Sequence, residues 1–397
     1  MMPAGKRIRV LHVGKFYPPV SGGMERVLKL LCDREKASVD TRVLVANTAP
    51  QTVHEVVDGV PVTRVATHGA AGSVAICPTF PYWLARQDAD VVVIHEPNPL
   101  GLLAYALARP RGRLIVWFHS EVVRPGLQYR LCYRPWFAHA MRRAARLIVA
   151  SPPMAAAAQL QGFPVTTSVI PYGIDEDSMR ATPEVTARAS RLRQQFAGPI
   201  ALCVGRMVPY KGLDVLLRAM AEIEATLVLV GIGPQAAALR ALAQETGVTA
   251  KTHFAGEVND DDLRAWYHAC DFFVLPSTTR AEAFGVVQTE AMACGKPVVS
   301  TALPTGVPWV NRHMETGLVV PPGDHRALAA AMRSLAADQS LRDRLGAAGR
   351  ARVAAEFTAD RMSARAIEAY CDVLLEQRRA PAPAVEADRV SAGADVA

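Results

Sequence analysis

The stretch Glu282-Ala-Phe-Gly-Val-Val-Gln-Thr-Glu290 sets two carboxylates on either side of a Phe-Gly turn. The residues after the turn predict a short helix that starts near Gly285, stops at Gly295 and leads into a strand at 297–300. A helix start offers unpaired backbone N–H groups and a positive dipole end, which suit a phosphate. Glu282 precedes this start, and Glu290 lies more than a turn inside, where a carboxylate accepts hydrogen bonds from a diol. One loop-helix unit can therefore bind sugar, phosphate and ribose in turn, although the spacing alone equally fits a capping carboxylate and a solvated helix glutamate.

Length and composition bound the class of protein. A chain of 397 residues exceeds the usual limit of one hydrophobic core, so two domains are expected. Its 50% hydrophobic and 20% charged residues are ordinary for a globular protein. The seven cysteines are dispersed, which argues against a zinc site or disulfide framework and favours a reducing cytosol. No signal peptide or membrane-spanning run is expected, so the interpretation is a cytoplasmic protein.

The net charge of +7 favours an anionic ligand or surface. Nucleic acid would satisfy the charge, but no recognition motif supports it, so no nucleic-acid partner is expected. Between Glu121 and Leu147 the sequence is basic and aromatic, which predicts a helical segment with a cationic face. That face is either solvated or docks on anionic lipid. Its members are Arg124, Arg130, Tyr133, Arg134, Trp136, Arg142, Arg143 and Arg146.

Both halves of the chain alternate apolar strands with helices, which predicts an α/β fold with parallel sheets covered on both faces. Strands are expected at 9–14, 41–46, 61–66, 90–94, 113–118, 146–150, 167–170, 199–204, 225–230, 252–255 and 272–275. Residues 1–175 form the first domain, 176–195 a charged linker, and 196–358 the second domain. A last helix is expected at 359–379, capped by Thr358, and a disordered tail at 380–397.

Three further motifs follow strand ends, where ligands of doubly wound sheets bind. Arg206 and Lys211 form a cationic loop that suits a diphosphate, or is simply solvated. Gly22 and Gly23 precede a helix, where backbone can approach an anion closely, or form only a tight turn. His119 ends a strand, where a histidine is more often structural than catalytic.

These motifs, taken in order, resemble those of retaining glycosyltransferases of family 4 ("glycosyl transferases group 1"). The resemblance extends from Val10 to about Arg379. It rests on Tyr17-Pro-Pro-Val-Ser-Gly-Gly-Met-Glu25, His95-Glu-Pro-Asn-Pro-Leu100, Phe118-His-Ser120, Val169-Ile-Pro-Tyr-Gly-Ile-Asp175, Val204-Gly-Arg-Met-Val-Pro-Tyr-Lys-Gly212, Leu229-Val-Gly-Ile-Gly-Pro234 and the stretch from Glu282 to Glu290.

The resemblance implies the GT-B fold, in which two Rossmann-like domains face each other across a cleft. The first domain would then hold the acceptor and the second the nucleotide-sugar donor. The last helix would cross back onto the first domain.

The resemblance also implies a role for each matching residue. Arg206 and Lys211 would contact the donor phosphates, and Gly23, beside Gly22, would approach the diphosphate in a closed cleft. His119 would touch and orient the donor sugar rather than act as a general base. In the second domain, Glu282 would contact the sugar hydroxyls and Glu290 the ribose. The backbone N–H groups of Phe284, Gly285 and Val286 would bind the phosphate. Glu257 and Val258 would lie at the edge of the nucleobase.

The implied reaction retains the anomeric configuration and needs neither a metal nor a cofactor besides the nucleotide-diphosphate sugar. A weaker likeness to bacterial polysaccharide-assembly members favours mannose or a related hexose, a GDP-sugar donor and a glycan or polyprenyl-linked acceptor. The enzyme would then work peripherally on the inner face of the cytoplasmic membrane, in lipopolysaccharide or exopolysaccharide synthesis. Two alternatives remain open: a nucleotide-sugar epimerase of the same architecture, and a non-catalytic scaffold subunit.

Overall fold

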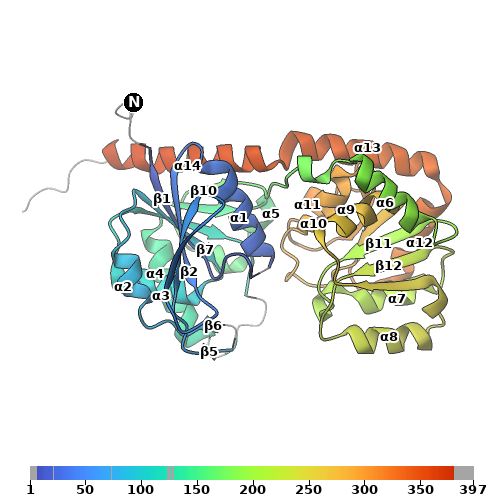
Figure 1. Ribbon diagram of the computed structural model, residues 1–397, viewed down its shortest axis with the longest axis horizontal. Helices are drawn as coiled ribbons and strands as arrows, with labels where there is room; N and C mark the ends of the chain where they lie inside the picture. The colour runs from blue at the N-terminus through green and yellow to red at the C-terminus, as the bar shows by residue number, and fades with distance from the viewer. Residues whose placement is uncertain (1–6, 21, 73, 123–125, 127–128, 380–397) are drawn as a thin grey trace, which may run out of the picture.

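The computed structural model describes residues 7–20, 22–72, 74–122, 126 and 129–379. The predicted tail at 380–397 and Arg124 of the basic segment therefore lie outside the described residues. Two α/β domains lie side by side, each with a twisted sheet between layers of helices (Figure 1). The predicted fold class, two doubly wound Rossmann-like domains, is confirmed.

The first domain is built on an eight-stranded sheet in the order β10-β9-β8-β7-β1-β2-β4-β3. All neighbouring strands run parallel except β3, which pairs antiparallel with β4 at the edge. The central strands are buried and mostly apolar because helices cover both faces of the sheet. The strands of this domain are β1 (Arg9–Val13), β2 (Asp40–Ala46), β3 (Val53–Val57), β4 (Val60–Val65), β7 (Val91–Glu96), β8 (Arg113–Phe118), β9 (Arg146–Val149) and β10 (Thr167–Val169), with the small hairpin β5 (Ala70–Ala71) and β6 (Val74–Ala75).

The helices of the first domain follow strand ends, as right-handed crossovers require. The helical segment predicted between Glu121 and Leu147 contains a π-helical turn at Tyr129–Tyr133 and an α-helix at Arg134–Arg143. These elements are α1 (Gly23–Glu35), α2 (Phe80–Ala85), α3 (Pro99–Ala108), η1 (Tyr129–Tyr133), α4 (Arg134–Arg143), α5 (Pro152–Ala155) and η2 (Ala158–Leu160).

The second domain has a six-stranded, all-parallel sheet in the order β13-β12-β11-β14-β15-β16. Its strands are β11 (Ile200–Val204), β12 (Thr226–Val230), β13 (Thr252–Gly256), β14 (Phe272–Leu275), β15 (Val298–Thr301) and β16 (Gly317–Val320). Its helices are η4 (Pro209–Lys211), α7 (Leu213–Met220), α8 (Ala236–Glu245), η5 (Thr249–Lys251), α9 (Asp260–Ala269), α10 (Val286–Ala293), α11 (Val307–Val310), α12 (His325–Ala337) and α13 (Gln339–Glu356).

The segment expected to be a linker, 176–195, is largely ordered as helix. It contains η3 (Asp177–Met179) and α6 (Pro183–Arg193), and Thr182 caps α6 by accepting a hydrogen bond from the Val185 amide. Helix α6 packs against α9 of the second domain, with Arg188 and Asp262 paired at 3.0 Å. The first covalent connection between the domains is therefore the short stretch before η3, and the second lies at the start of α14.

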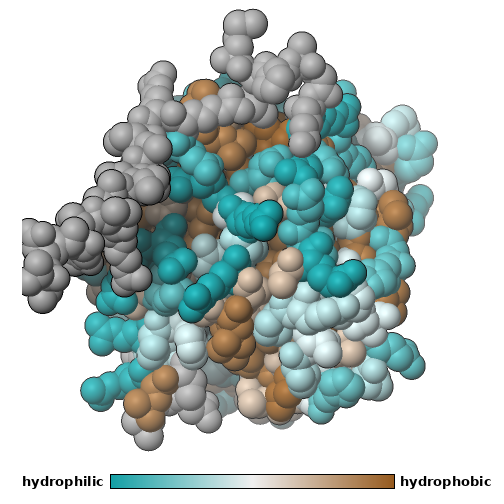
Figure 2. Space-filling view, turned by 90° about the vertical axis from the view of Figure 1, so that its left-hand side faces the viewer, coloured by the Kyte–Doolittle hydropathy of each residue, from teal (hydrophilic) through white to brown (hydrophobic). Residues whose placement is uncertain are grey.

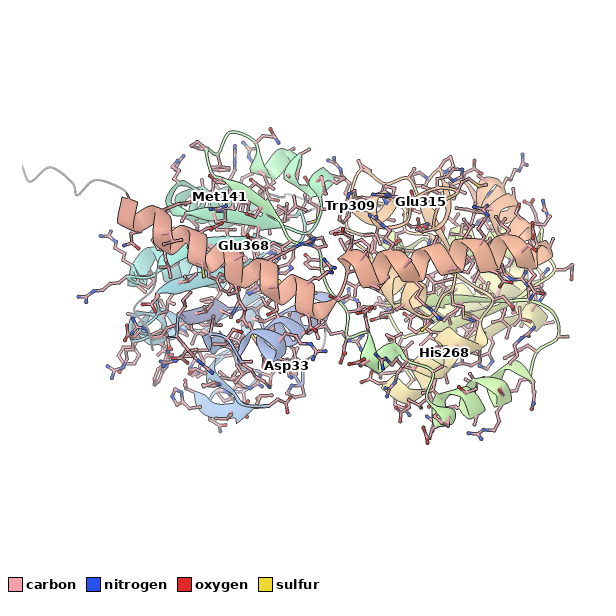
Figure 3. The ribbon with its side chains drawn as sticks, turned by 90° about the horizontal axis from the view of Figure 1, so that it is seen from above. Asp33, Met141, His268, Trp309, Glu315 and Glu368 are labelled. Atoms are coloured by element: carbon pink, nitrogen blue, oxygen red, sulfur yellow. The ribbon has the colours of Figure 1, made fainter. Side chains whose placement is uncertain are left out.

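The last helix, α14 (Ala359–Arg379), leaves the second domain and lies across the first. Seen from above, α13 covers the second domain and α14, which carries Glu368, continues over the first (Figure 3). Helix α1, which carries Asp33, packs against α14. Thr358 caps the helix through its hydroxyl, which accepts from the Arg361 amide at 3.1 Å. The buried face recurs at helical spacing: Met362, Ala366, Ala369, Tyr370 and Val373.

The start of α14 passes so close to the inter-domain segment that a side chain at Gly173 has no room. A Cβ atom there would lie 2.3 Å from the carbonyl oxygen of Thr358 and 2.6 Å from the amide nitrogen of Ala359. Because both neighbours are backbone atoms, relief requires moving the helix.

Gly173→Ala should therefore lower the free energy of unfolding by about 1–3 kcal/mol. The matched control is Gly126→Ala, because a Cβ at Gly126 would meet nothing within 4 Å. Urea unfolding followed by circular dichroism measures both variants. Equal unfolding midpoints for Gly173→Ala and the parent would show that α14 does not approach this residue so closely.

Candidate active site

An ion pair between two strand-end loops forms the centre of the site in the second domain. Glu282 follows β14, and Lys211 ends the 3₁₀ turn η4 that follows β11. Since β11 and β14 are neighbours in a parallel sheet, their carboxyl ends meet at one edge. Lys211 Nζ lies 2.6 Å from Glu282 Oε2, and the Ser277 hydroxyl donates to the same oxygen at 2.8 Å.

Lys211 stays charged despite its burial. Burial by itself would lower the pKa of the ammonium, but the charge and hydrogen bond of Glu282 more than offset it, so the pKa is raised above its ordinary value. Arg206 is exposed and lines, together with Lys211, a small hollow at the end of β11. Both cations therefore line the same strand end, and their contact with a donor phosphate stays a prediction.

The start of α10 lies directly after Glu282. Gly285 caps the helix with φ of +72°, a conformation that other residues adopt only with strain. Phe284 is buried, and its carbonyl accepts from Gln288 Nε2 at 2.6 Å. The helix thus begins where the sequence predicted, with the positive end of its dipole in the loop of Glu282.

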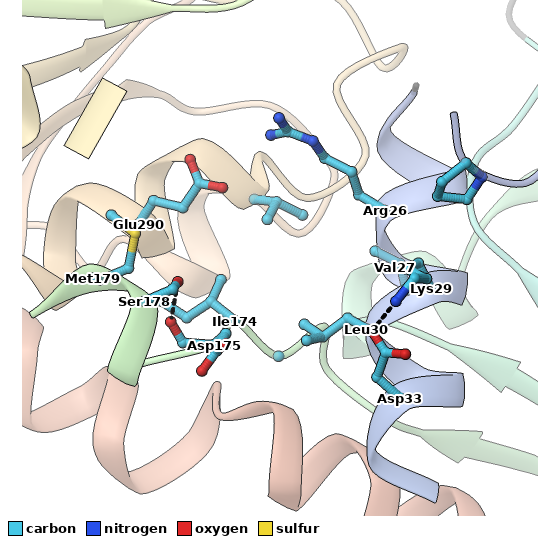
Figure 4. Close-up of a pocket in the computed structure, with 13 residues that line it drawn as sticks. Arg26, Val27, Lys29, Leu30, Asp33, Ile174, Asp175, Ser178, Met179 and Glu290 are labelled. Atoms are coloured by element: carbon cyan, nitrogen blue, oxygen red, sulfur yellow. Dashed lines mark hydrogen bonds and ion pairs between the residues drawn. The ribbon is translucent and has the colours of Figure 1, made fainter. Parts of the chain in front are cut away.

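A cavity of about 270 Å³ separates α10 from α1 of the first domain. Glu290 and Val286 line it from α10, and Arg26 lines it from α1. Figure 4 shows Glu290 and Arg26 approaching the cavity from opposite domains. Residues 173–175, before η3, close it on the side of the inter-domain segment. The site is therefore shared between the domains rather than contained in either.

Glu290 is oriented by Tyr267 of α9, whose hydroxyl donates to Oε2 at 2.6 Å. Burial raises the pKa of the Glu290 carboxyl, while the Tyr267 hydrogen bond and the charge of Arg26 act in the opposite direction. One carboxylate oxygen is therefore held in place by a neutral donor, an arrangement that suits recognition of hydroxyl groups.

Gly22 and Gly23 begin α1 on the opposite side of this cavity. Gly22 is the cap residue, and a Cβ there would lie 2.2 Å from Glu25 Oε2, whereas a Cβ at Gly23 would meet nothing within 4 Å. Gly23 therefore borders open space at the helix start, where an anion could approach the backbone.

His119 is buried, with 6% of its surface exposed, and both of its ring nitrogens have protein partners. Nε2 lies 2.8 Å from His95 Nδ1, and Nδ1 lies 2.7 Å from the Tyr172 hydroxyl. A contact between this ring and a donor sugar would require Tyr172 to give up its hydrogen bond, so the role of His119 stays a prediction.

Glu257 and Val258 follow the edge strand β13, beyond the lining of the cavity. Glu257 is exposed and Val258 is half-buried. Their assignment to the nucleobase also stays a prediction. The structure thus gathers the predicted residues into the Lys211–Glu282 pair, the cavity between α1 and α10, and the buried ring of His119.

Three residues of the site were not predicted from the sequence. The sequence could have indicated Arg26, because it places a cation in the first turn of the helix that follows the glycine pair. Ser277 and Tyr267 had no such signal, because only the packing of β14 and α9 against the glutamate loop brings them to Glu282 and Glu290.

Among the described residues, one group of three potential metal ligands converges: His12, Cys32 and Glu35, all buried. His12 Nε2 lies 2.6 Å from Glu35 Oε1, and His12 Nδ1 lies 2.9 Å from His95. Both ring nitrogens of His12 are thus used in hydrogen bonds, and the group is better described as a hydrogen-bonded core cluster than as a metal site.

The sequence matches two family descriptions that together span both domains. Residues 21–178 match "Glycosyltransferase Family 4", and residues 191–352 match "Glycosyl transferases group 1". The chain belongs to this family of glycosyltransferases.

Two curated relatives cover nearly the whole length of this glycosyltransferase. D-rhamnosyltransferase WbpZ of Pseudomonas aeruginosa is 33% identical over 89% of this chain and 93% of its own. O-antigen chain mannosyltransferase C of Escherichia coli is 30% identical over 94% of this chain and 100% of its own. Among solved structures, sucrose-phosphate synthase of Thermosynechococcus elongatus superposes with a TM-score of 0.75 at 23% identity, covering 93% of this chain and 100% of that one. This superposition supports the GT-B fold.

Substitution of the two glutamates of the site, Glu282 and Glu290, should affect different properties of the enzyme. Glu290→Gln should weaken binding of free GDP by about tenfold, since it removes the charge that the resemblance places on the ribose hydroxyls. Glu282→Gln should bind GDP within about twofold of the parent yet lose sugar transfer by about 100-fold or more, because the resemblance places Glu282 on the sugar hydroxyls. Calorimetry with GDP and a transfer assay measure the two effects.

Tyr267→Phe is the matched probe of orientation, because it frees Glu290 without removing its charge. It should weaken GDP binding by about threefold, less than Glu290→Gln. Loss of GDP binding in Glu282→Gln alone, or identical behaviour of both glutamine variants, would contradict this division of roles.

Proposed function

We propose that this glycosyltransferase is a retaining, metal-independent hexosyltransferase. Its donor is a nucleotide-diphosphate sugar that carries mannose or a closely related sugar, with GDP as the nucleotide. Its acceptor is a glycan or a polyprenyl-linked glycan of a cell-surface polysaccharide, reached at the cytoplasmic face of the membrane.

One observation carries the proposal: Lys211 and Glu282 are paired at 2.6 Å at the start of α10, and Glu290 lines the cavity from the same helix. An ammonium has three donors, so the bond to Glu282 leaves Lys211 able to donate to a phosphate. Cation, carboxylate and helix start thus offer partners for phosphate, sugar and ribose in two crossovers that follow neighbouring strands, β11 and β14.

The reaction can be written without a metal or an enzyme nucleophile. The acceptor hydroxyl attacks the anomeric carbon on the face from which the diphosphate departs, so the configuration is retained. The bond between that carbon and the phosphate oxygen breaks, the new glycosidic bond forms, and the hydroxyl proton passes to the leaving phosphate. Arg206 and Lys211 stabilise the negative charge that develops on the diphosphate.

The choice of sugar is supported by the two relatives, one named for D-rhamnose and one for mannose. D-Rhamnose is 6-deoxymannose, so both sugars carry an axial hydroxyl at carbon 2. The choice of GDP rests on the resemblance to polysaccharide-assembly enzymes, because Glu257 and Val258 do not identify a base.

A donor screen tests this function directly. GDP-mannose and GDP-rhamnose should be consumed in the presence of a polyprenyl-linked glycan, with UDP-, ADP- and dTDP-sugars much slower. The rate should be unchanged in EDTA, and Lys211→Ala should reduce it by about 100-fold or more. Loss of activity in EDTA, restored by Mg²⁺ or Mn²⁺, would contradict metal independence, and release of an epimer without an acceptor would favour an epimerase.

The basic segment of the first domain supports peripheral contact with a membrane. Arg130, Arg134, Arg142 and Arg143 are exposed, and Leu131 beside them is 65% exposed. Arg146 does not belong to this surface, because it is buried and pairs with Glu376 of α14 at 2.6 Å. The outer face of the first domain shows hydrophobic patches among hydrophilic ones (Figure 2). In the described part of the chain, no helix is both long and apolar enough to cross a bilayer.

Reversing Arg142 and Arg143 to Glu should weaken sedimentation with vesicles of phosphatidylglycerol, because each Arg near an anionic surface contributes about 1 kcal/mol. The matched control reverses two exposed arginines of the second domain, Arg218 of α7 and Arg326 of α12. High salt should release the parent protein. Equal sedimentation of both reversed variants and the parent at low salt would indicate a solvated face with no lipid role.

A further inference from the structure

A continuous line of buried hydrogen bonds, here called the histidine network, runs through the first domain. It begins at Glu35 at the end of α1 and ends at Tyr172 beside the inter-domain segment. The successive distances are 2.6 Å, 2.9 Å, 2.8 Å and 2.7 Å. Its members are Glu35, His12, His95, His119 and Tyr172.

The sheet determines this alignment. His12, His95 and His119 lie on or just after β1, β7 and β8, which are consecutive neighbours in the sheet. The rings of His95 and His119 stack with centroids 5.1 Å apart and planes inclined by 18°. Every member of the network is at most 6% exposed, so water does not compete for these hydrogen bonds.

The carboxylate end gives the network one direction. A carboxylate oxygen accepts hydrogen bonds, so we assign His12 Nε2 as the donor to Glu35 Oε1. Glu35 also accepts from Thr41 at 2.9 Å and, through Oε2, from Tyr370 of α14 at 3.1 Å. Surrounded by donors on three sides, the carboxylate remains an acceptor.

The direction of hydrogen-bond donation is the same at every ring if each histidine carries a proton on only one of its two nitrogens. Burial lowers the pKa of His95 well below its ordinary value and that of His119 to about 3, so both rings are neutral at physiological pH. With His12 protonated on Nε2, its bare Nδ1 accepts from His95 Nε2, and His95 Nδ1 then accepts from His119 Nε2. The Nδ1 atom of His119 is left unprotonated and accepts from the Tyr172 hydroxyl.

The far end of the network reaches the second domain. The Tyr172 ring packs on Phe284 of the glutamate motif, with centroids 4.9 Å apart. A histidine protonated in the opposite sense would present a donor to Tyr172 instead of an acceptor. The acceptor role of Glu35 thus decides whether His119 presents a hydrogen-bond donor or an acceptor where the two domains meet.

We propose that Glu35, His12 and His95 are positioning residues that hold His119 as its Nε2–H tautomer, so that Nδ1 is an obligatory acceptor for a hydroxyl group. In this structure the hydroxyl is that of Tyr172. Resting on the proposed function, the inference extends to catalysis: a hydroxyl of the donor sugar that displaces Tyr172 must donate to His119. Glu35, His12 and His95 therefore select the orientation of the sugar without touching it.

The tautomer can be measured without any transfer activity. In protein labelled with ¹⁵N-histidine, the His119 resonances, assigned by their loss in His119→Gln, should show a protonated Nε2 and a bare Nδ1. Protonation on Nδ1, or on both nitrogens, at neutral pH would overturn the proposal even if the enzyme transfers sugar as proposed.

Glu35→Gln tests the origin of the direction, because an amide can either donate to His12 or accept from it. The variant should show mixed His119 tautomers and a fall in kcat/KM for transfer of about tenfold, with GDP binding unchanged. The matched control is Glu376→Gln, which also alters a contact between α14 and the first domain but lies outside the network. It should keep the Nε2–H tautomer and the parent kcat/KM.

An unchanged kcat/KM in a folded Glu35→Gln protein would refute the catalytic part of the proposal while leaving the proposed function intact. If Glu35→Gln does not fold, Tyr172→Phe replaces it in the kinetic test. That variant removes the hydroxyl that competes for His119 Nδ1, so the KM for the donor should fall by about threefold with the tautomer unchanged. A raised KM would refute displacement of Tyr172 by the sugar.

Discussion

One helix, α14, fixes the position of the two domains relative to each other. Helix α14 starts at the edge of the second domain and buries Met362, Ala366 and Tyr370 against the first, while Ile174 and Thr358 join the two connections by a β-bridge. The strand ends of both sheets point into one cleft only because this connection fixes their relative position. The cavity between α1 and α10, with Arg26 on one side and Glu290 on the other, is a direct consequence. The same helix reaches the histidine network through the hydrogen bond of Tyr370 to Glu35.

Within that frame, the cleft is bordered by two buried polar systems with different chemistry. The Lys211–Glu282 pair keeps both charges beside the start of α10, and removing one partner would leave the other unpaired in a poorly solvated place. Burial lowers the pKa of His95 and of His119, so these two rings are neutral, and the proposed role of the histidine network is to transmit only the direction of hydrogen bonding. Phe284, on which Tyr172 packs, lies two residues after Glu282, so the two systems meet at a single turn. Charge is thus available for a diphosphate, and oriented neutral groups are available for a sugar.

The sequence predicts the elements that are governed by local periodicity and capping. The parallel strands, the start of α10 at Gly285 and the bounds of α14 after Thr358 were all predicted correctly. Features set by long-range packing were not. The antiparallel edge strand β3 is exposed and does not alternate apolar with polar residues, so its pattern carries little signal. Arg146 looked like part of a cationic face, but its strand turns it toward Glu376, 230 residues later. The partners of Glu282 and Glu290, Ser277 and Tyr267, and the alignment of His12 with His95 likewise depend on neighbouring strands that are distant in sequence.

The central claim is that the cleft binds a nucleotide diphosphate with its phosphates at the start of α10. A crystal structure of the protein with bound GDP tests this most directly. The account predicts the diphosphate within hydrogen-bonding distance of Lys211 and of the backbone N–H groups at 284–286, with the ribose hydroxyls on Glu290. A diphosphate held elsewhere, for example wholly within the first domain, with Lys211 still paired only to Glu282, would contradict it.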